Sequence, residues 1–127
     1  MRLQDCRMNA SIAVSDMDRA TAFYEGELGL RPETTGADGS KVYATAGGAS
    51  LHVYPSPEHA GRSTATLATW YVDDVGQMVD ALTASGVTFE HYDMPGVTRQ
   101  GDIHLTGKSK AAWFKDPDGN IIALVGR

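Results

Sequence analysis

The chain has 127 residues, 42% of them hydrophobic, and a formal net charge of −5 at pH 7. This length suits one domain, or two small halves that share a core. The eleven Lys and Arg residues are scattered rather than clustered, which excludes a phosphate-binding surface and a nucleic-acid partner.

The remaining composition narrows the class of protein further. The single cysteine, Cys6, excludes a disulfide within the chain and a Cys-rich zinc site. The first residues lack an apolar signal core, and no apolar run reaches membrane-spanning length. We therefore expect a cytoplasmic protein without a membrane partner.

The first half of the chain has the pattern of one strand, one helix and three strands. Residues 8–14 alternate between two faces, and Asp16 then caps a helix that Gly29 ends. Three strands follow, separated by glycine-rich turns, at residues 30–36, 41–46 and 49–54. This order predicts a βαβββ module over residues 8–54.

The same order restarts after residues 55–63, which have the composition of a linker. Residues 65–72 form the predicted first strand, with Leu67, Thr69 and Tyr71 on one face and Trp70 on the other, in the core. A helix capped by Asp73-Asp74 and ended by Gly86 follows, with apolar residues at helical spacing at Val75, Met78, Val79 and Leu82. The second module is predicted to span residues 64–127.

The rest of the second half contains a long loop and a closing hairpin. Strands are predicted at residues 87–92 and 103–105, on either side of a loop in which residues 99–102 form a mobile lid. The stretch K-A-A-W-F-K-D-P-D-G-N-I-I-A-L-V, residues 110–125, predicts two strands around an Asp-Pro-Asp-Gly turn.

The two halves repeat at an offset of about 58 residues, which favours a duplicated module over an array of short repeats. In a sheet of four strands with a helix on one face, no element covers the other face. Two such sheets can bury part of that face together and curve around a cavity. The prediction is a single α+β domain, residues 1–127, in which two tandem βαβββ modules form a cupped mixed sheet around a cavity.

Four segments resemble the vicinal oxygen chelate superfamily, which includes glyoxalases, extradiol dioxygenases and bleomycin-resistance proteins. They are residues 12–30, 70–75, 86–97 and 111–125. The ending W-F-K-D-P-D-G-N, together with Y-D-M-P-G at residues 92–96, is similar to a bacterial glyoxalase/bleomycin-resistance-like branch. The resemblance implies the glyoxalase/bleomycin-resistance fold and a homodimer, sometimes with halves exchanged between chains.

In metal-using members of this family the ligands come from the first and last strand of each module. The corresponding positions here are Asn9, His52, Leu67 and Ala123. Only His52 is a strong donor, and Ala123 stands where the metal enzymes carry Glu. Because a catalytic divalent ion needs about three protein ligands, we expect no metal and no other cofactor.

The resemblance and the residue types together predict a binding protein of the bleomycin-resistance type. It would hold a small planar or amphipathic organic molecule in a metal-free cavity. Trp113 offers a flat wall for a ring-bearing ligand if its indole faces the cavity. The predicted ligand-binding residues are Asn9, Ser11, His52, Tyr54, Leu67, Thr69, Tyr71, Trp113 and Ala123.

An enzyme is the alternative: a glyoxalase- or dioxygenase-like lyase or isomerase with displaced metal ligands, or a metal-free acid–base catalyst. The candidate catalytic residues are His52 and His91. His91 shares a strand face with Asp93, which would orient it as a base, although this run also fits a solvated strand end. His52 fits equally well as a polar wall residue. His104 follows the loop and lies within reach of the cavity mouth, and His59 is expected on the surface.

Overall fold

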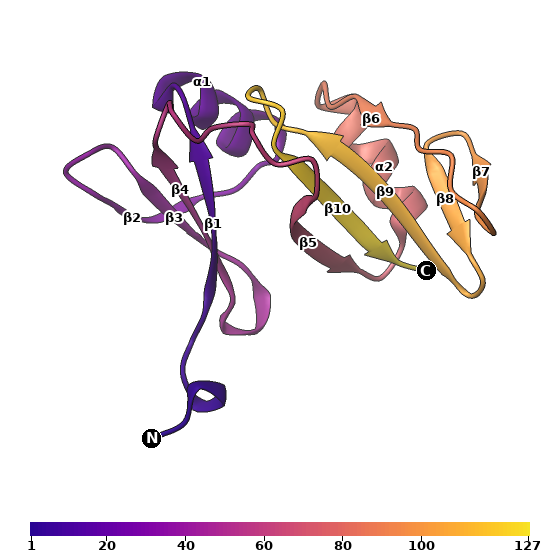
Figure 1. Ribbon diagram of the computed structural model, residues 1–127, viewed down its shortest axis with the longest axis horizontal. Coiled ribbons are helices and arrows are strands. Elements are labelled where there is room, and N and C mark those ends of the chain that lie inside the picture. Colours follow the sequence, from indigo (N-terminus) through magenta and orange to yellow (C-terminus); the bar gives the residue numbers. More distant parts are fainter. The chain divides into compact units, whose positions relative to one another are not determined.

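The computed structural model describes residues 1–127. The chain forms two compact units, Met1–Arg62 and Ser63–Arg127 (Figure 1). Each unit combines one mixed sheet with one main helical segment, which confirms the predicted α+β class and the repeated order of elements.

The first unit contains a four-stranded sheet in the order β1-β4-β3-β2, in which β1 and β4 are parallel and the other pairs antiparallel. A parallel β1–β4 pair requires a crossover, and the helical segment supplies it. The elements, in chain order, are η1 (Leu3–Asp5), β1 (Asn9–Val14), α1 (Met17–Thr21), η2 (Ala22–Glu27), β2 (Pro32–Thr35), β3 (Lys41–Ala44), η3 (Ala46–Gly48) and β4 (Ser50–Pro55).

The helical segment of the first unit begins as predicted but does not remain an α-helix. The side chain of Asp16 accepts hydrogen bonds from the backbone N–H groups of Asp18, at 2.8 Å, and Arg19, at 3.1 Å, and so caps α1. From Ala22 the chain widens into the π-helical turn η2. Gly29 then takes a φ of 74°, which reverses the chain at little steric cost.

The second unit contains a six-stranded sheet in the order β5-β10-β9-β8-β7, with β6 also paired to β9. The pair β5–β10 is parallel, as β1–β4 is in the first unit. The elements, in chain order, are β5 (Thr66–Val72), α2 (Val75–Ala84), β6 (Phe89–Glu90), β7 (Thr98–Gln100), β8 (Ile103–Thr106), β9 (Ser109–Lys115) and β10 (Ile121–Gly126).

The predicted loop before residue 103 is wrong in part, because residues 98–100 form the strand β7. Arg99 pairs with His104 and Gln100 with Ile103 in an antiparallel hairpin. Backbone groups in a hairpin satisfy one another's hydrogen bonds, and this local pairing is not visible as an apolar alternation in the sequence. The segment predicted as a mobile lid is therefore the end of β7 followed by a turn.

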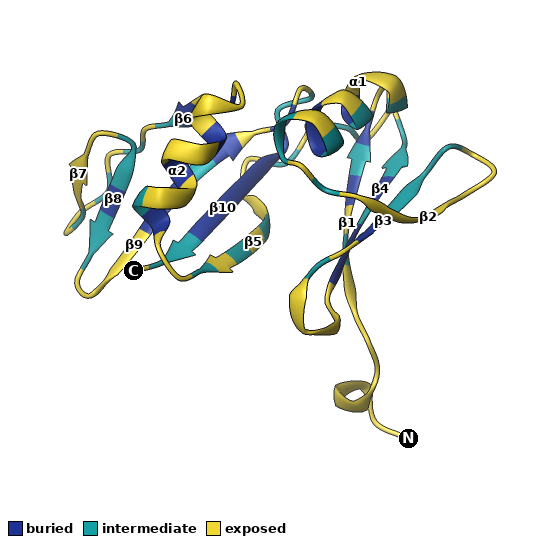
Figure 2. Ribbon diagram, turned by 180° about the vertical axis from the view of Figure 1, so that it is seen from behind, coloured by how far each residue is buried: buried dark blue, intermediate teal, exposed yellow.

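Each sheet packs its apolar face against the helical segment of its own unit. In the first unit the largest fully buried side chains include Ile12, Tyr24 and Tyr43; in the second they include Val75, Phe114 and Ile122. Figure 2 shows β10 buried along most of its length, which fits its place between two neighbouring strands. Burying each such aliphatic side chain contributes about 1.5–3 kcal/mol.

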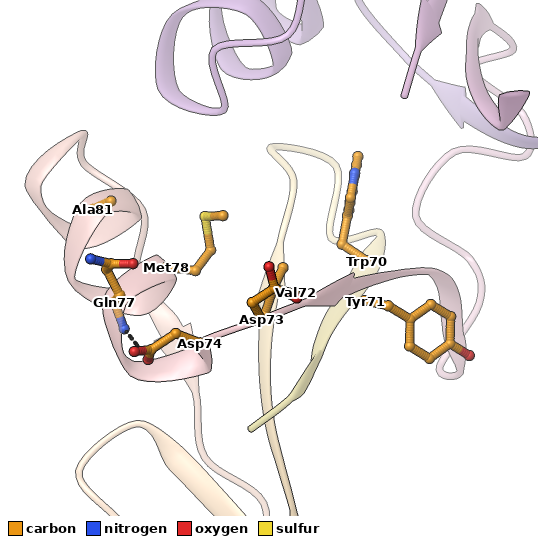
Figure 3. A pocket seen from close by; sticks show the side chains of 8 residues that line it. All are labelled: Trp70, Tyr71, Val72, Asp73, Asp74, Gln77, Met78 and Ala81. Carbon is orange, nitrogen blue, oxygen red and sulfur yellow. Dashed lines mark hydrogen bonds between the residues drawn. The ribbon is translucent and has the colours of Figure 1, made fainter. Parts of the chain in front are cut away.

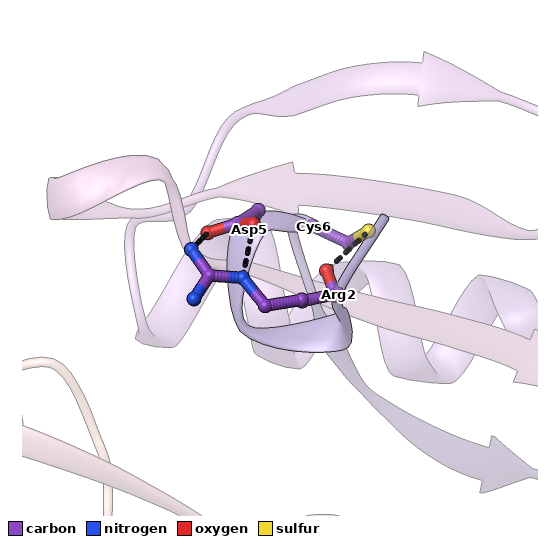
Figure 4. A network of polar contacts seen from close by, with 3 residues as sticks. All are labelled: Arg2, Asp5 and Cys6. Carbon is purple, nitrogen blue, oxygen red and sulfur yellow. Dashed lines mark hydrogen bonds and ion pairs between the residues drawn. The ribbon is translucent and has the colours of Figure 1, made fainter.

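The N-terminal segment is exposed and ordered by local contacts. The guanidinium of Arg2 donates to the carboxylate of Asp5 over 3.1 Å, and the Cys6 thiol lies 3.5 Å from the carbonyl oxygen of Arg2 (Figure 4). These contacts join residues close in sequence, so they shape only this segment. No helix in the protein is both long enough and apolar enough to cross a membrane.

Candidate functional site

In the first unit, four of the predicted site residues lie on the sheet face opposite the helical segment. Strand β1 pairs in parallel with β4, so that Asn9 lies beside Ser50 and Ser11 beside His52. Their neighbours Ile12 and Val53 point to the other face and are fully buried in the core. The alternation of the strands therefore presents Asn9, Ser11, His52 and Tyr54 together on the face that carries no helix.

His52 is held by contacts on both sides. Its Nδ1 atom lies 3.4 Å from Ser11 Oγ, and its ring stacks on Tyr54 with 5.3 Å between ring centroids. A hydrogen bond from Ser40 holds the pKa of the Asp38 carboxyl below its usual range, and the charge of His52 adds to this lowering. His52 is thus a partly exposed imidazole that Ser11 and Tyr54 orient.

In the second unit the strand register brings three predicted residues side by side. Ala123 on the central strand β10 pairs with Thr69 on β5 and with Trp113 on β9. Val125 pairs with Tyr71 two residues further along, so Tyr71 lies on the same face, with 84% of its surface exposed. The opposite face carries Ile122 and Leu124, which are buried in the core.

The indole of Trp113 crosses the sheet on this face. Its Nε1 atom donates a hydrogen bond to Thr66 Oγ1 over 3.1 Å. Trp113 lies on β9 and Thr66 on β5, and β10 runs between these strands. The ring must therefore lie over β10, and Ala123 is only 3% exposed. A residue as small as alanine leaves room for the indole at this point.

Leu67 does not follow the alternation of faces that was predicted for its strand. The register of β5 on β10 shifts between Ile121 and Ile122, so that Thr66 and Ala68 have partners on β10 while Leu67 has none. This irregularity brings Thr66 to the face that carries Trp113. Sequence alternation alone does not locate such a bulge, which explains why Thr66 was missed.

Two further aromatic residues join Trp113 on this face. The sequence placed His104 only near the cavity mouth and did not point to Tyr92. Tyr92 packs edge-to-face on Trp113 with ring centroids 5.5 Å apart, and His104 does so at 4.8 Å. His104 is fully buried. It lies on β8 in register with Ala111, two residues before Trp113 on β9. Finding this contact required the pairing of β8 with β9.

His91 has a carboxylate partner, but from a different segment than predicted. Its Nε2 atom lies 2.7 Å from Asp102 Oδ1, in the turn between β7 and β8. Both side chains are more than one-third exposed. A histidine and a carboxylate at this distance have the geometry of a base and the group that orients it.

The four metal positions implied by the resemblance do not supply a metal-binding donor set. Leu67 and Ala123 have no lone pair to donate, and the Trp113 indole passes over β10, where Ala123 lies. No group of three or more His, Cys, Asp or Glu side chains in the protein is arranged to hold a metal ion. The residues therefore do not fit the metal centre of the metal-using members.

The second unit also has an open groove on the helix side of its sheet, where Trp70 lies (Figure 3). It has a volume of about 600 Å³. Trp70 pairs with the core residue Leu124, which confirms that it lies on the helix side, although it is only half-buried. The lining residues come from β5, α2 and the turn between them: Trp70, Tyr71, Val72, Asp73, Asp74, Gln77, Met78 and Ala81.

Solved structures that are similar to this chain come from bacterial glyoxalase/bleomycin-resistance and antibiotic-binding proteins. The glyoxalase/bleomycin resistance protein from Catenulispora acidiphila superposes with a TM-score of 0.72 at 24% identity, covering 95% of this chain and 97% of its own. TnmS3, an antibiotic-binding protein from Streptomyces sp. CB03234, gives 0.67 at 25% identity, with 94% and 93% covered. A bleomycin resistance determinant encoded on the transposon Tn5 gives 0.72 at 18% identity, with 96% and 98% covered.

These similarities confirm the predicted fold, two βαβββ-like modules as in glyoxalase/bleomycin-resistance structures. No curated protein sequence matches the chain significantly. The model of one protein family, described as the Glyoxalase/Bleomycin resistance protein/Dioxygenase superfamily, matches residues 7–124, nearly the whole chain. The chain therefore belongs to the glyoxalase/bleomycin resistance protein/dioxygenase superfamily, as the resemblance in its sequence predicted.

Proposed function

We propose that the protein binds a small, flat aromatic molecule on the helix-free face of the sheet in its second unit, where Trp113 lies, and releases it chemically unchanged. Thr69, Tyr71, Trp113 and Ala123 of the predicted ligand-binding residues lie on this face. They combine a polar group with aromatic rings, as ligand sites commonly do. The single observation that carries the proposal is the Trp113 indole, which is fixed across β10 by its hydrogen bond to Thr66.

A fixed indole favours binding because little side-chain entropy is lost when a ring stacks on it. The same indole lies over the strand on which the metal enzymes of the family carry their last metal ligand. An indole in this position and a metal ion bound by that ligand would occupy the same space. The similarity to TnmS3, which is an antibiotic-binding protein, agrees with a binding role.

The test is a melting scan of the protein against a panel of flat aromatic compounds. A compound present at one hundred times its dissociation constant should stabilise the folded state by about 2.7 kcal/mol. The variant Trp113→Phe should bind the same compound at least about tenfold more weakly, because the indole and its hydrogen bond to Thr66 are lost.

Trp70→Phe is the matched control, because it makes the same substitution on the opposite face of the same sheet. It should keep the affinity of the natural chain. The proposal is wrong if no aromatic compound raises the melting temperature, or if Trp113→Phe and Trp70→Phe bind equally well.

The second candidate is a metal-free acid–base enzyme that uses His91, and the 2.7 Å contact with Asp102 favours it. Chemical analysis of a bound compound after long incubation separates the two functions. Recovery of the unchanged compound supports binding alone. A product that forms with the natural chain and not with His91→Ala supports the enzyme.

We also propose that the protein is a homodimer, as the resemblance implies. The first strand of each unit, β1 and β5, lies at the end of its sheet and has a strand neighbour on one side only. Such edges favour association with another strand. The expectation that the two sheets enclose one cavity stays a prediction from the sequence.

A further inference from the structure

Tyr92, His104 and Trp113 form a cluster of three rings in the second unit, which we call the aromatic cluster. Each ring contacts the other two, with centroid separations of 6.1 Å between Tyr92 and His104, 5.5 Å between Tyr92 and Trp113, and 4.8 Å between His104 and Trp113. Both contacts to the indole are nearly perpendicular, at 80° and 86°. The cluster thus joins two polar rings to the proposed stacking surface.

The hydrogen bond that His104 makes determines where its proton lies. The backbone N–H of Tyr92 donates to His104 Nε2 over 3.0 Å. A nitrogen that accepts a hydrogen bond carries no proton, so the ring is neutral and its proton is on Nδ1. His104 therefore presents Nδ1 as a hydrogen-bond donor.

This donor and the hydroxyl beside it are buried without partners. His104 Nδ1 and Tyr92 Oη both lack a hydrogen-bond partner, and His104 is fully buried. Buried polar groups in folded proteins are nearly always paired, and an unpaired one is often found at a functional site. Tyr92 lies just after the short strand β6, in a segment without regular structure, so its side chain can move more easily than those of β8 and β9.

The charged side chains nearest the cluster are offset or exposed to solvent. Glu90 lies opposite Trp113 on β6, and its carboxylate is 3.4 Å from Lys115 Nζ. Arg99 lies opposite His104 on β7, and it donates to the carbonyl oxygen of Gly101 over 2.6 Å. The Glu90 charge is offset by Lys115, and solvent screens the charge of the exposed Arg99, so a neutral acceptor suits the neutral Nδ1 donor.

We propose that Tyr92 and His104 form the polar end of the ligand site and that the ligand is an aromatic ketone or a similar aryl carbonyl compound. Its ring stacks on Trp113, the Tyr92 side chain moves aside, and the carbonyl oxygen accepts hydrogen bonds from His104 Nδ1 and the Tyr92 hydroxyl. This inference rests on the proposed binding function and adds the chemical class of the ligand to it.

The test uses 9-fluorenone and fluorene, two flat compounds of nearly the same size, of which only the first has a carbonyl oxygen. Equilibrium dialysis gives both dissociation constants for the natural chain and each variant. The natural chain should bind fluorenone about tenfold more tightly than fluorene, the preference that one buried hydrogen bond supplies.

His104→Gln should reduce this ratio towards one, because glutamine keeps an acceptor for the Tyr92 N–H and lacks the Nδ1 donor. Tyr92→Phe should also reduce the ratio, and it removes only a hydroxyl, so it decides the question if His104→Gln does not fold. His59→Gln makes the same substitution in the linker between the units and should leave the ratio unchanged.

Two further outcomes separate this inference from the proposed function. Both compounds could bind through Trp113 with the same ratio of dissociation constants in the natural chain, His104→Gln and Tyr92→Phe. In that case Tyr92 and His104 do not bind the carbonyl oxygen, and the binding function stands. If neither compound binds while another flat aromatic compound of the panel does, this inference is wrong and the binding function stands. If no compound of the panel binds, both are overturned.

Discussion

Glu25, in the π-helical turn η2 of the first unit, joins this turn to the strand β3. Its carboxylate accepts hydrogen bonds from Lys41 Nζ at 2.7 Å and from the Tyr43 hydroxyl at 3.0 Å. The bond from Lys41 is the main cause that holds the pKa of the Glu25 carboxyl below its ordinary value of 4.5. Burial, with Glu25 beside it, raises the pKa of the Tyr43 hydroxyl.

This pKa predicts how the stability of the protein depends on pH. The folded state favours the ionised carboxyl, so its contribution is fully present above pH 4.5 and is lost as the pH falls through the lowered pKa. The free energy of unfolding should therefore decrease with acidification below pH 4.5. Glu25→Gln should cost about 1 kcal/mol at pH 7 and make this decrease shallower.

Urea titrations at a series of pH values measure this effect. Lys41→Met removes the main cause of the lowered pKa, so it should flatten the same part of the profile. Identical pH slopes for the natural chain and Glu25→Gln would show that the contact does not contribute to the stability.

At the scale of the elements, the strand β10 links the core of the second unit to the proposed site. Its even-numbered residues Ile122 and Leu124 are buried on the helix side, while Ala123 lies on the other face with Trp113. One strand in the middle of a sheet therefore contributes to the core on one face and to the proposed site on the other.

Ala123→Glu should destabilise the protein by about 3 kcal/mol, because it forces a carboxylate under the indole or displaces the indole from Thr66. Thr69→Glu is the control: it introduces the same charge on the same face, one strand away, at an exposed position. It should change the stability by at most about 0.5 kcal/mol.

Denaturant titration compares the two variants. Equal stabilities of Ala123→Glu and the natural chain would mean that the indole does not cover this position. The introduced carboxylate should not create a metal site, because His52 alone among the other family positions is a strong donor; elemental analysis of the purified variant checks this.

At the scale of the whole molecule, the edge strand β5 carries exposed apolar side chains. Leu67 is 36% exposed and Tyr71 is 84% exposed. Apolar groups beside an unpaired strand edge favour association, which agrees with the proposed homodimer.

Light scattering coupled to size-exclusion chromatography should give twice the mass of the chain. Leu67→Lys should shift the protein towards the monomer on dilution, because a charged side chain protects a strand edge from pairing. Leu3→Lys changes an exposed apolar residue of the N-terminal segment and should leave the dimer unchanged. A monomer at all concentrations would exclude the dimer.

The sequence by itself determined the order of the main helices and strands, apart from β7, because this order depends on local signals. Asp16 and Asp74 cap the two helices, Gly29 and Gly86 follow them with positive φ, and the alternation of β1, β4 and β10 separates the core face from the helix-free face. Caps, turns and alternation depend on residues only a few positions apart, so they can be recognised in the sequence. The family resemblance was visible for the same reason.

Only the tertiary structure decided what surrounds Trp113. The hydrogen bond to Thr66 joins residues 47 positions apart, and it depends on a bulge in β5 that shifts the register. The contacts of Tyr92 and His104 depend on the pairing of β8 with β9. Strand pairing and bulges are determined by contacts between distant segments, and no local pattern encodes them. The sequence therefore located the face of the sheet that carries the proposed site, and the structure shows which side chains contact Trp113 there.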